Sequence, residues 1–145
     1  MSRDPHFVSL ENMYLTAPIN EFYAPRIQVM EGEATVQIDL SEKFFHAAGA
    51  VHGSVYFKML DDAAFFAANS LERELLVLTT SFTTYLTRPV SVGQLRSAGR
   101  VVNRNKSQFI AESVVHDAEG NEVGRGSGIF VRSRVPLGNA CGYSV

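Results

Sequence analysis

The chain has 145 residues, of which 46% are hydrophobic and 19% are charged, and its formal net charge is −2. This length and composition are typical of one globular domain, and the absence of a basic run argues against a nucleic-acid-binding surface. No apolar stretch reaches the roughly 18 residues that a membrane span needs, and the first residues lack the hydrophobic core of a signal peptide.

The first part of the chain is predicted to form a short helix and a hairpin. Apolar side chains at mixed spacing over residues 8–17, followed by Pro18, indicate the helix. From Arg26 to Leu40 apolar and polar residues alternate, with a turn expected at Glu31-Gly32-Glu33, which predicts a strand or a hairpin. Residues 43–51 are expected to be a loop.

Residues 52–70 predict a helix of about 16 residues that is apolar on nearly every side. Such a helix belongs in the protein interior, where an Asp is rarely found unless it is paired. Asp61 and Asp62 both lie on this helix, and a buried charge costs several kcal/mol unless it gains partners or a proton. Lys58 can pair with Asp62 four residues later, but it also reaches Asp61, so the spacing alone does not decide which carboxylate is free.

The second half of the chain is predicted to be a series of strands. Thr, Phe and Tyr are frequent in the first of them, as expected for a pleated surface. Gly124, Gly126 and Gly128 fall on one face of the last strand, where we expect the helix to pack closely. The strands are expected at 77–87, 95–102, 108–116 and 123–134, with turns at 103–106 and 117–121.

These elements predict an α+β fold in which an antiparallel sheet wraps around one long central helix. We expect an N-terminal segment with a short helix (1–25), a main domain (26–135) and a flexible tail (136–145). One layer of sheet leaves strand edges to protect, so edge pairing into a homo-oligomer is expected. The single cysteine, Cys141, cannot form an internal disulfide, which suits the reducing cytoplasm.

Three short motifs together resemble one known family. His52-Gly53-Ser54 opens the central helix, Leu60-Asp61 places an acid nine residues after the histidine, and Tyr85 to Val90 followed by Gly93 ends the next strand. Over about residues 26–133 this pattern resembles the hotdog-fold acyl-CoA thioesterases, in their PaaI-like branch of the phenylacetate-pathway type. His46 stands where that family has an Asn, and Ser54 stands where it has a second Gly.

The resemblance implies a hotdog fold and hydrolysis of a small or medium acyl-CoA by a homodimer or a dimer of dimers. Asp61 would act as general base on water or attack the thioester directly, and both routes stay open. The backbone N–H of Gly53, at a helix N-terminus, would polarise the carbonyl, with His46 as a substitute for the Asn. His52 would support the loop or contact substrate. No cofactor is implied.

The same resemblance suggests residues that contact the substrate. Phe57, Phe65 and Tyr85 would lie beside the acyl group in an apolar cleft at the subunit interface. Thr79 and Ser81 would supply a hydroxyl that holds the attacking water. Apart from the resemblance, the phosphates of coenzyme A could meet one of the basic residues Arg88, Arg104, Lys106, Arg132 and Arg134. The four histidines lack the spacing of a zinc site, so no metal is expected.

Other functions compete with hydrolysis. A hotdog hydratase or dehydratase would also pair a His with an acid, and the missing Asn favours a non-catalytic acyl-CoA-binding module. A purely structural domain would leave Asp61 unexplained. No Gly-x-Ser-x-Gly elbow precedes a helix, which argues against a serine hydrolase. The acyl chain and its carrier, coenzyme A or acyl carrier protein, stay open.

Overall fold

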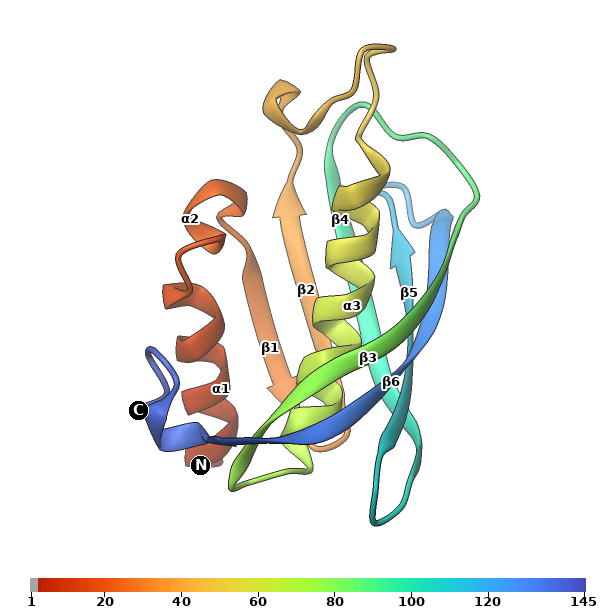
Figure 1. Cartoon of the computed structure of the whole chain (residues 1–145). Coiled ribbons are helices and arrows are strands. Elements are labelled where there is room, and N and C mark those ends of the chain that lie inside the picture. Colours follow the sequence, from red (N-terminus) through yellow and green to blue (C-terminus); the bar gives the residue numbers. More distant parts are fainter. Residues whose placement is uncertain (1–2) are drawn as a thin grey trace.

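A six-stranded antiparallel sheet curves around one long helix, α3, in the computed structural model, which describes residues 3–145 (Figure 1). The strand order is β1-β2-β4-β5-β6-β3, which confirms the predicted α+β layout. The strands are β1 (Arg26–Met30), β2 (Glu33–Asp39), β3 (Leu75–Leu86), β4 (Gln94–Arg104), β5 (Phe109–His116) and β6 (Glu122–Pro136). The helices are α1 (Pro5–Thr16), α2 (Asn20–Tyr23) and α3 (Gly53–Ser70), with 3-10 turns at Glu42–Phe44 and Leu137–Asn139.

Helix α3 begins at Gly53 because His52 caps it. His52 is extended, and its Nδ1 accepts a hydrogen bond from the backbone N–H of Ser54 at 3.0 Å. The apolar side chains of α3, with Leu60 and Ala63 fully buried, form the core against the inner face of the sheet. The prediction of a buried central helix is therefore confirmed.

The middle of α3 is fixed to the sheet by close backbone approach. A Cβ on Gly99 of β4 would lie 2.5 Å from the carbonyl oxygen of Ala63, so only glycine fits there. The hydroxyls of Ser97 and Ser113 donate hydrogen bonds to the carbonyls of Met59 and Leu60, at 2.6 and 2.7 Å. These contacts hold the helical turn that carries the two aspartates.

The glycines of β6 contact a neighbouring strand more than the helix. Cβ atoms on Gly126 and Gly128 would overlap the ring of Phe82, which projects from β3. Only Gly124 approaches α3, where its Cβ would lie 3.7 Å from the ring of Tyr56. The prediction that all three glycines accommodate the helix was wrong, because β3 pairs with β6 and lays the Phe82 ring across it.

The two edges of the sheet differ. At the β1 edge the N–H of Val29 donates to the Glu11 carboxylate at 2.7 Å, and the Val29 carbonyl accepts from the Arg3 guanidinium at 2.8 Å. Glu11 of α1 and Arg3, just before that helix, therefore block this edge at Val29. At the other edge, β3 pairs only with β6 within the described residues, so one of its sides is open.

The C-terminal residues lie against α1 instead of forming the flexible tail that we expected. Leu137 is buried, and the side chain of Asn12 donates to the carbonyl of Ser144 at 2.7 Å. The buried ring of His6 joins the tail to α3: its Nε2 donates to the Asn69 carbonyl at 2.8 Å, and its Nδ1 accepts from the Tyr143 hydroxyl at 2.7 Å. Burial lowers the pKa of His6, which favours this neutral ring.

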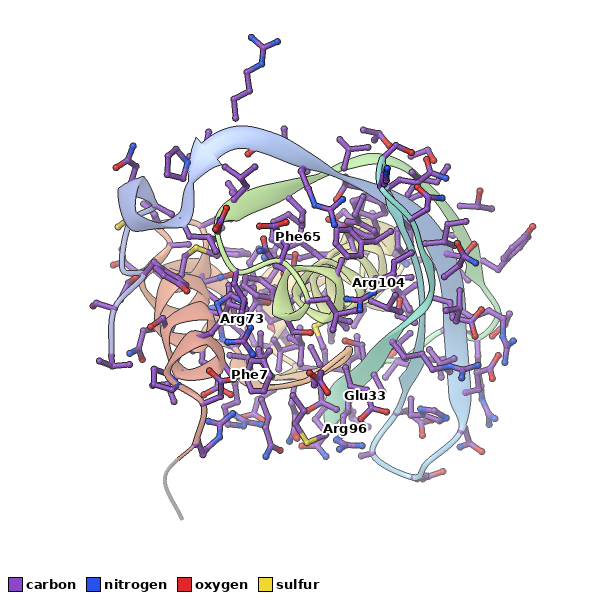
Figure 2. The ribbon with its side chains drawn as sticks, turned by 90° about the horizontal axis from the view of Figure 1, so that it is seen from below. Phe7, Glu33, Phe65, Arg73, Arg96 and Arg104 are labelled. Atoms are coloured by element: carbon purple, nitrogen blue, oxygen red, sulfur yellow. The ribbon has the colours of Figure 1, made fainter. Side chains whose placement is uncertain are left out.

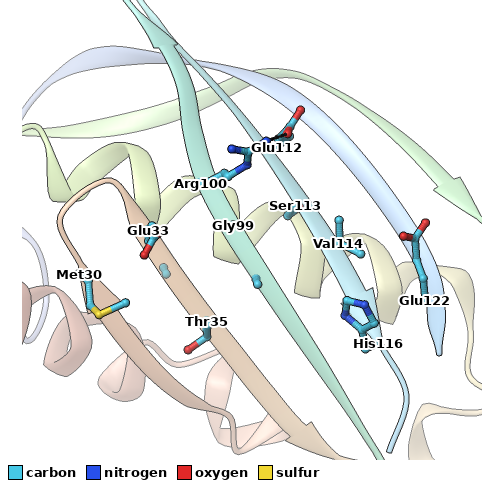
Figure 3. A pocket seen from close by; sticks show the side chains of 12 residues that line it. Met30, Glu33, Thr35, Gly99, Arg100, Glu112, Ser113, Val114, His116 and Glu122 are labelled. Atoms are coloured by element: carbon cyan, nitrogen blue, oxygen red, sulfur yellow. Dashed lines mark hydrogen bonds and ion pairs between the residues drawn. The ribbon is translucent and has the colours of Figure 1, made fainter. Parts of the chain in front are cut away.

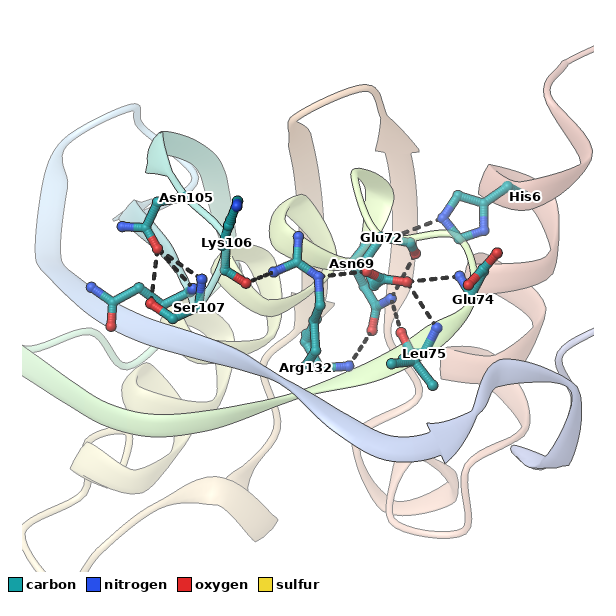
Figure 4. A network of polar contacts seen from close by, with 11 residues as sticks. His6, Asn69, Glu72, Glu74, Leu75, Asn105, Lys106, Ser107 and Arg132 are labelled. Atoms are coloured by element: carbon teal, nitrogen blue, oxygen red, sulfur yellow. Dashed lines mark hydrogen bonds and ion pairs between the residues drawn. The ribbon is translucent and has the colours of Figure 1, made fainter.

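A polar network closes the turn between α3 and β3 (Figure 4). The Glu72 carboxylate accepts from the backbone N–H groups of Glu74 and Leu75 and from the guanidinium of Arg132 on β6, at 2.7 to 2.9 Å. The buried side chain of Asn69 accepts from the N–H of Val77 at 2.9 Å. The start of β3 is thus anchored to both α3 and β6, which fixes the strand residues that follow.

Candidate active site

Asp61 is a half-buried carboxylate on α3, on the side that faces β3. Its Oδ1 accepts a hydrogen bond from the Thr79 hydroxyl at 2.8 Å, and its Oδ2 has no protein partner within residues 3–145. Burial raises the pKa of Asp61 to about 6; nearby Asp62 adds to this rise, while the Thr79 hydroxyl and Lys58 restrain it. A carboxylate with a free oxygen and a pKa near neutrality suits general-base chemistry.

The neighbouring carboxylate, Asp62, is held by two partners through one of its oxygens. Its Oδ2 accepts from the Lys58 ammonium at 2.7 Å and from the Tyr14 hydroxyl at 2.6 Å. The Lys58 ammonium also lies 4.9 Å from the centre of the Tyr23 ring, a cation–π distance. Asp62 is therefore a structural ion-pair partner, and the carboxylate left free by Lys58 is Asp61.

Asp61 and Thr79 line a mostly apolar groove of about 560 Å³. Apolar side chains from α3 and β3, including Phe65 and Leu78, lie on one side of it, and residues from α1, the α1–α2 turn and the C-terminal segment lie on the other. Seen along α3, Phe65 projects toward β3 and β6 (Figure 2), and its ring centre is 6.1 Å from that of Phe130. The groove combines a carboxylate oxygen that has no protein partner with a mostly apolar lining, as small-molecule sites do.

The raised pKa of Asp61 predicts a cost in stability. Because the folded pKa exceeds the unfolded value of 3.8, the protein should lose stability as the pH rises from about 4 to about 6. Asp61→Asn removes the charge and should raise the free energy of unfolding at pH 8 by about 2 kcal/mol after solvent screening of the half-buried group. Urea unfolding at pH 8 and pH 4 checks this, since the gain should be several-fold smaller at the lower pH.

The matched control is Asp62→Asn, which changes the adjacent carboxylate. It breaks the ion pair with Lys58 and weakens the hydrogen bond from Tyr14, so it should destabilise the protein at pH 8. If Asp61→Asn destabilised the protein as Asp62→Asn does, the cost of burying the Asp61 charge would have to be offset by contacts of its carboxylate.

The predicted carbonyl-polarising group, Gly53, lies at the N-terminus of α3. Its backbone N–H makes no hydrogen bond in the described part of the chain, as expected for the first turn of a helix. Asp61 lies eight positions after Gly53, which places them about 12 Å apart along the helix axis. One copy of the chain therefore does not bring these two groups to the same carbonyl.

The two predicted histidines bond within their own loops. The exposed ring of His52 caps α3 through Ser54, which matches the loop-supporting role that we considered for it. The exposed ring of His46 accepts from the N–H of Ala48 at 3.0 Å and lies in the turn before α3. Neither ring hydrogen-bonds to Asp61.

The remaining predicted residues divide between the groove and an exposed surface. Thr79 and Phe65 lie with Asp61 in the groove. Phe57 is 41% exposed and Tyr85 is 61% exposed. The exposed residues Ser81 and Arg88 also lie outside the groove, and the Arg88 guanidinium forms no ion pair among residues 3–145.

Residues that the sequence did not single out also line the groove. Most of them come from the two ends of the chain, and no local pattern connects those with Asp61. A weak signal was the apolar Ile19 after Pro18, which is 59% exposed and has no place in the core. The chief members are Met13, Ile19, Leu76, Val135, Ala140 and Cys141.

A second hollow, of about 450 Å³, lies on the face of β2, β4 and β5 that is turned away from α3 (Figure 3). Its charged residues include Arg100 and Glu112, which pair with each other at 2.8 Å. No cluster of three metal-binding side chains occurs in the described structure. Within residues 3–145, no helix is both long and apolar enough to cross a membrane.

Comparison with known proteins identifies the family. Residues 48–124 match the model of the thioesterase superfamily, whereas no curated sequence matches the chain. PaaI from the phenylacetic acid degradation operon of E. coli is 20% identical, with a TM-score of 0.81 over 92% of this chain and 99% of that one. AziG from S. sahachiroi is 23% identical, with a TM-score of 0.75 over 82% and 98%.

A protein from Streptococcus mutans bound to acetyl-CoA is 17% identical, with a TM-score of 0.68 over 73% of this chain and 85% of that one. These likenesses show that the sheet wrapped around α3 is the hotdog fold of thioesterases. Because the family model covers more than half of the sequence, the protein belongs to the thioesterase superfamily.

Proposed function

We propose that this protein is an acyl-CoA thioesterase that acts on small or medium acyl groups, with Asp61 as its general base. The observation that carries the proposal is the free Oδ2 of a half-buried carboxylate whose other oxygen is held by Thr79 in an apolar groove. Membership of the thioesterase superfamily supports the reaction class. The acetyl-CoA bound to a protein of the same fold supports coenzyme A as carrier.

In the proposed reaction, Asp61 removes a proton from water while the water oxygen bonds to the thioester carbonyl carbon. The carbonyl π electrons move to its oxygen, which gives a tetrahedral oxyanion. Collapse of this intermediate breaks the carbon–sulfur bond, and the proton on Asp61 passes to the leaving sulfur. A pKa of about 6 suits both steps, because Asp61 first accepts a proton and then donates it.

Direct attack by an Asp61 oxygen would give an anhydride that water then hydrolyses. A single turnover in H₂¹⁸O tests for the anhydride. Attack of water on the Asp61 carbon of the anhydride leaves the label in Asp61, whereas the general-base route puts the label only in the acid product.

The oxyanion needs a donor, and a second copy of the chain would supply it. Strand β3 has an open side, and no charged residue occurs from Leu75 to Thr87 to discourage pairing. The apolar side chains of Phe57, Tyr85 and Leu86 are exposed near this edge. A homodimer formed through paired β3 strands would cover them, and two such dimers would give the tetramer.

The register of such pairing would complete the site. If a two-fold axis passes through Thr83, and the bulge between Thr79 and Ser81 adds one residue on that side, antiparallel pairing places Thr79 of one copy opposite Leu86 of the other. Leu86 lies beside Gly53, since its Cδ1 is 3.0 Å from where a Cβ of Gly53 would be. The Gly53 N–H of one copy would therefore approach the Asp61 carboxylate of the other.

The groups around Gly53 would complete the substrate contacts. His46 and His52, in the loop before α3, would meet the thioester, with Phe57, Ser81 and Tyr85 along the shared edge. Arg88, exposed after β3, would attract the coenzyme A phosphates. A reducing compartment such as the cytoplasm suits the exposed free thiol of Cys141.

A panel of acyl thioesters tests the proposed function. Acetyl-, butyryl- and octanoyl-CoA, an octanoyl acyl carrier protein and an enoyl-CoA are incubated with the protein, and thiol release and hydration are followed. We expect release of coenzyme A from at least one acyl-CoA. Binding without release would identify a binding module, and hydration of the enoyl-CoA would identify a hydratase.

The hydrogen bond from Thr79 predicts a change in the pH profile. Because that bond stabilises the charged carboxylate, Thr79→Ala should raise the pKa of Asp61 above about 6. The acid limb of kcat/KM should move to higher pH, so the loss of activity is larger at pH 6 than at pH 8. Thr79→Ser keeps the hydroxyl and should keep the limb in place. An unmoved limb in Thr79→Ala would show that Asp61 is not the group that titrates.

A further inference from the structure

We propose that the C-terminal wall, defined as Val135, Ala140 and Cys141, sets the length of acyl chain that the enzyme accepts. This inference rests on the proposed function and assigns the groove beside Asp61 to the acyl chain of the substrate. The wall would act as the far side of the acyl pocket, so that chains which reach it fit and longer or bulkier chains meet it.

The groove is continuous from the carboxylate to the wall. Asp61 and Thr79 line it together with all three wall residues, and its volume of about 560 Å³ lies within the range of small-molecule pockets. Met13 and Ile19 contribute apolar surface to the same lining. An acyl chain that starts at a carbonyl near Asp61 therefore has an apolar path that ends at the C-terminal wall.

The charge of the groove favours an uncharged chain. Its charged lining residues are Lys58, Asp61 and Asp62, and the first and last neutralise each other in a salt bridge of 2.7 Å. The remaining charge is the Asp61 carboxylate, which would repel an acyl group that ends in a second carboxylate. Aliphatic and aromatic acyl groups are the chemical class that fits.

The wall is held in place by contacts on both of its sides. Before Ala140, the N–H of Leu137 donates to the Glu74 carbonyl at 2.9 Å, and the Leu137 side chain is buried. After Cys141, the Tyr143 hydroxyl donates to the buried ring of His6. Gly142 lies between them at φ +78°, against Thr16, where an added Cβ would collide. A wall anchored in this way can discriminate between chains by shape.

The residues involved lie outside the part of the chain that matches the thioesterase superfamily. That match covers residues 48–124, whereas the wall begins at Val135, and Met13 and Ile19 of the same lining lie near the N-terminus. The matched region contains Asp61 and Gly53, which carry the proposed chemistry. Chain-length selectivity would thus be supplied by the two ends of this particular chain.

Ala140→Phe tests the inference by filling the groove. Each methylene that the ring displaces from an apolar pocket costs about fourfold in binding, so the ratio of kcat/KM for octanoyl-CoA over acetyl-CoA should fall at least about tenfold. Asn139→Phe is the matched control, because it adds the same ring at an exposed neighbouring position that does not line the groove; its ratio should equal that of the natural protein. Cys141→Phe replaces Ala140→Phe if the latter fails to fold.

Affinities for S-octyl-CoA and for free coenzyme A, measured by calorimetry on the same variants, test the wall without catalysis. We expect Ala140→Phe to lose affinity for S-octyl-CoA and to keep that for coenzyme A. If the groove-filling variants left both the kcat/KM ratio and the affinity for S-octyl-CoA unchanged, the C-terminal wall would not set chain length. Hydrolysis by the natural protein would be unaffected by that result. Absence of hydrolysis in the natural protein would overturn the proposed function. The affinities for S-octyl-CoA would still show whether the C-terminal wall limits the length of the bound chain.

Discussion

Asp61→Asn should lower the turnover of acyl-CoA by at least about 100-fold, within the range found when a general base is removed. Asparagine has nearly the same shape as aspartate, and its Oδ1 can still accept the hydrogen bond from the Thr79 hydroxyl. It cannot take a proton from water, so only the chemical step is lost. The measurement is kcat for coenzyme A release, with circular dichroism and oligomeric state recorded alongside.

Asp62→Asn is the control for this loss. The two carboxylates are adjacent on α3, but Asp62 is occupied by Lys58 and Tyr14. Its replacement should therefore reduce turnover by less than about tenfold. Equal losses of turnover in the two variants would mean that activity depends on the structure of this turn of α3 and not on the Asp61 oxygen. An unchanged rate in Asp61→Asn would remove the proposed mechanism altogether.

The order of the elements could be predicted because each one carries a local pattern. The alternation from Arg26 to Leu40 has the period of a strand and breaks at Gly32, which takes φ +73° at the hairpin turn. The all-apolar stretch that became α3 predicts burial whatever covers it. A hairpin, a buried helix and four further strands leave few arrangements other than a sheet around a helix.

The contacts between elements could not be predicted in the same way. Gly126 and Gly128 indicate that something approaches β6, but their spacing does not say whether it is a helix or a ring. The ring belongs to Phe82, which depends on how β3 pairs with β6. The tail looked flexible because Pro136 and Gly142 interrupt any regular pattern, while its anchors, such as His6, lie at the other end of the chain.

In the candidate site, too, local patterns could be predicted and contacts between distant elements could not. The spacing of Lys58 leaves both aspartates within its reach, and the family resemblance was needed to favour Asp61. The structure adds a reason that no local pattern contains: Tyr14, 48 positions before Asp62, donates to that carboxylate and helps to hold it with Lys58. Burial and the Thr79 hydroxyl then give Asp61 its raised but restrained pKa.

Gly53→Pro should lower turnover by about 100-fold or more, because it removes the single N–H proposed to stabilise the oxyanion. Proline is well tolerated at the first position of a helix, and the extended His52 before it, at φ −62° and ψ 142°, already has the conformation that precedes proline. Gly53→Ala keeps the N–H and adds a Cβ at the same place beside Leu86. The difference in kcat between the two variants therefore measures the N–H itself.

Mixing the two inactive variants tests whether one site is built from two copies. If Gly53 of one copy serves Asp61 of the other, a mixed dimer of Gly53→Pro and Asp61→Asn has one site with both natural groups and one with neither. Random reassociation of equal amounts makes half of the dimers mixed, so activity should return to about one quarter of the natural level. Two groups acting within one copy would give no recovery, because every copy in the mixture lacks one of them. The open β3 edge and the separation of about 12 Å along α3 both favour recovery.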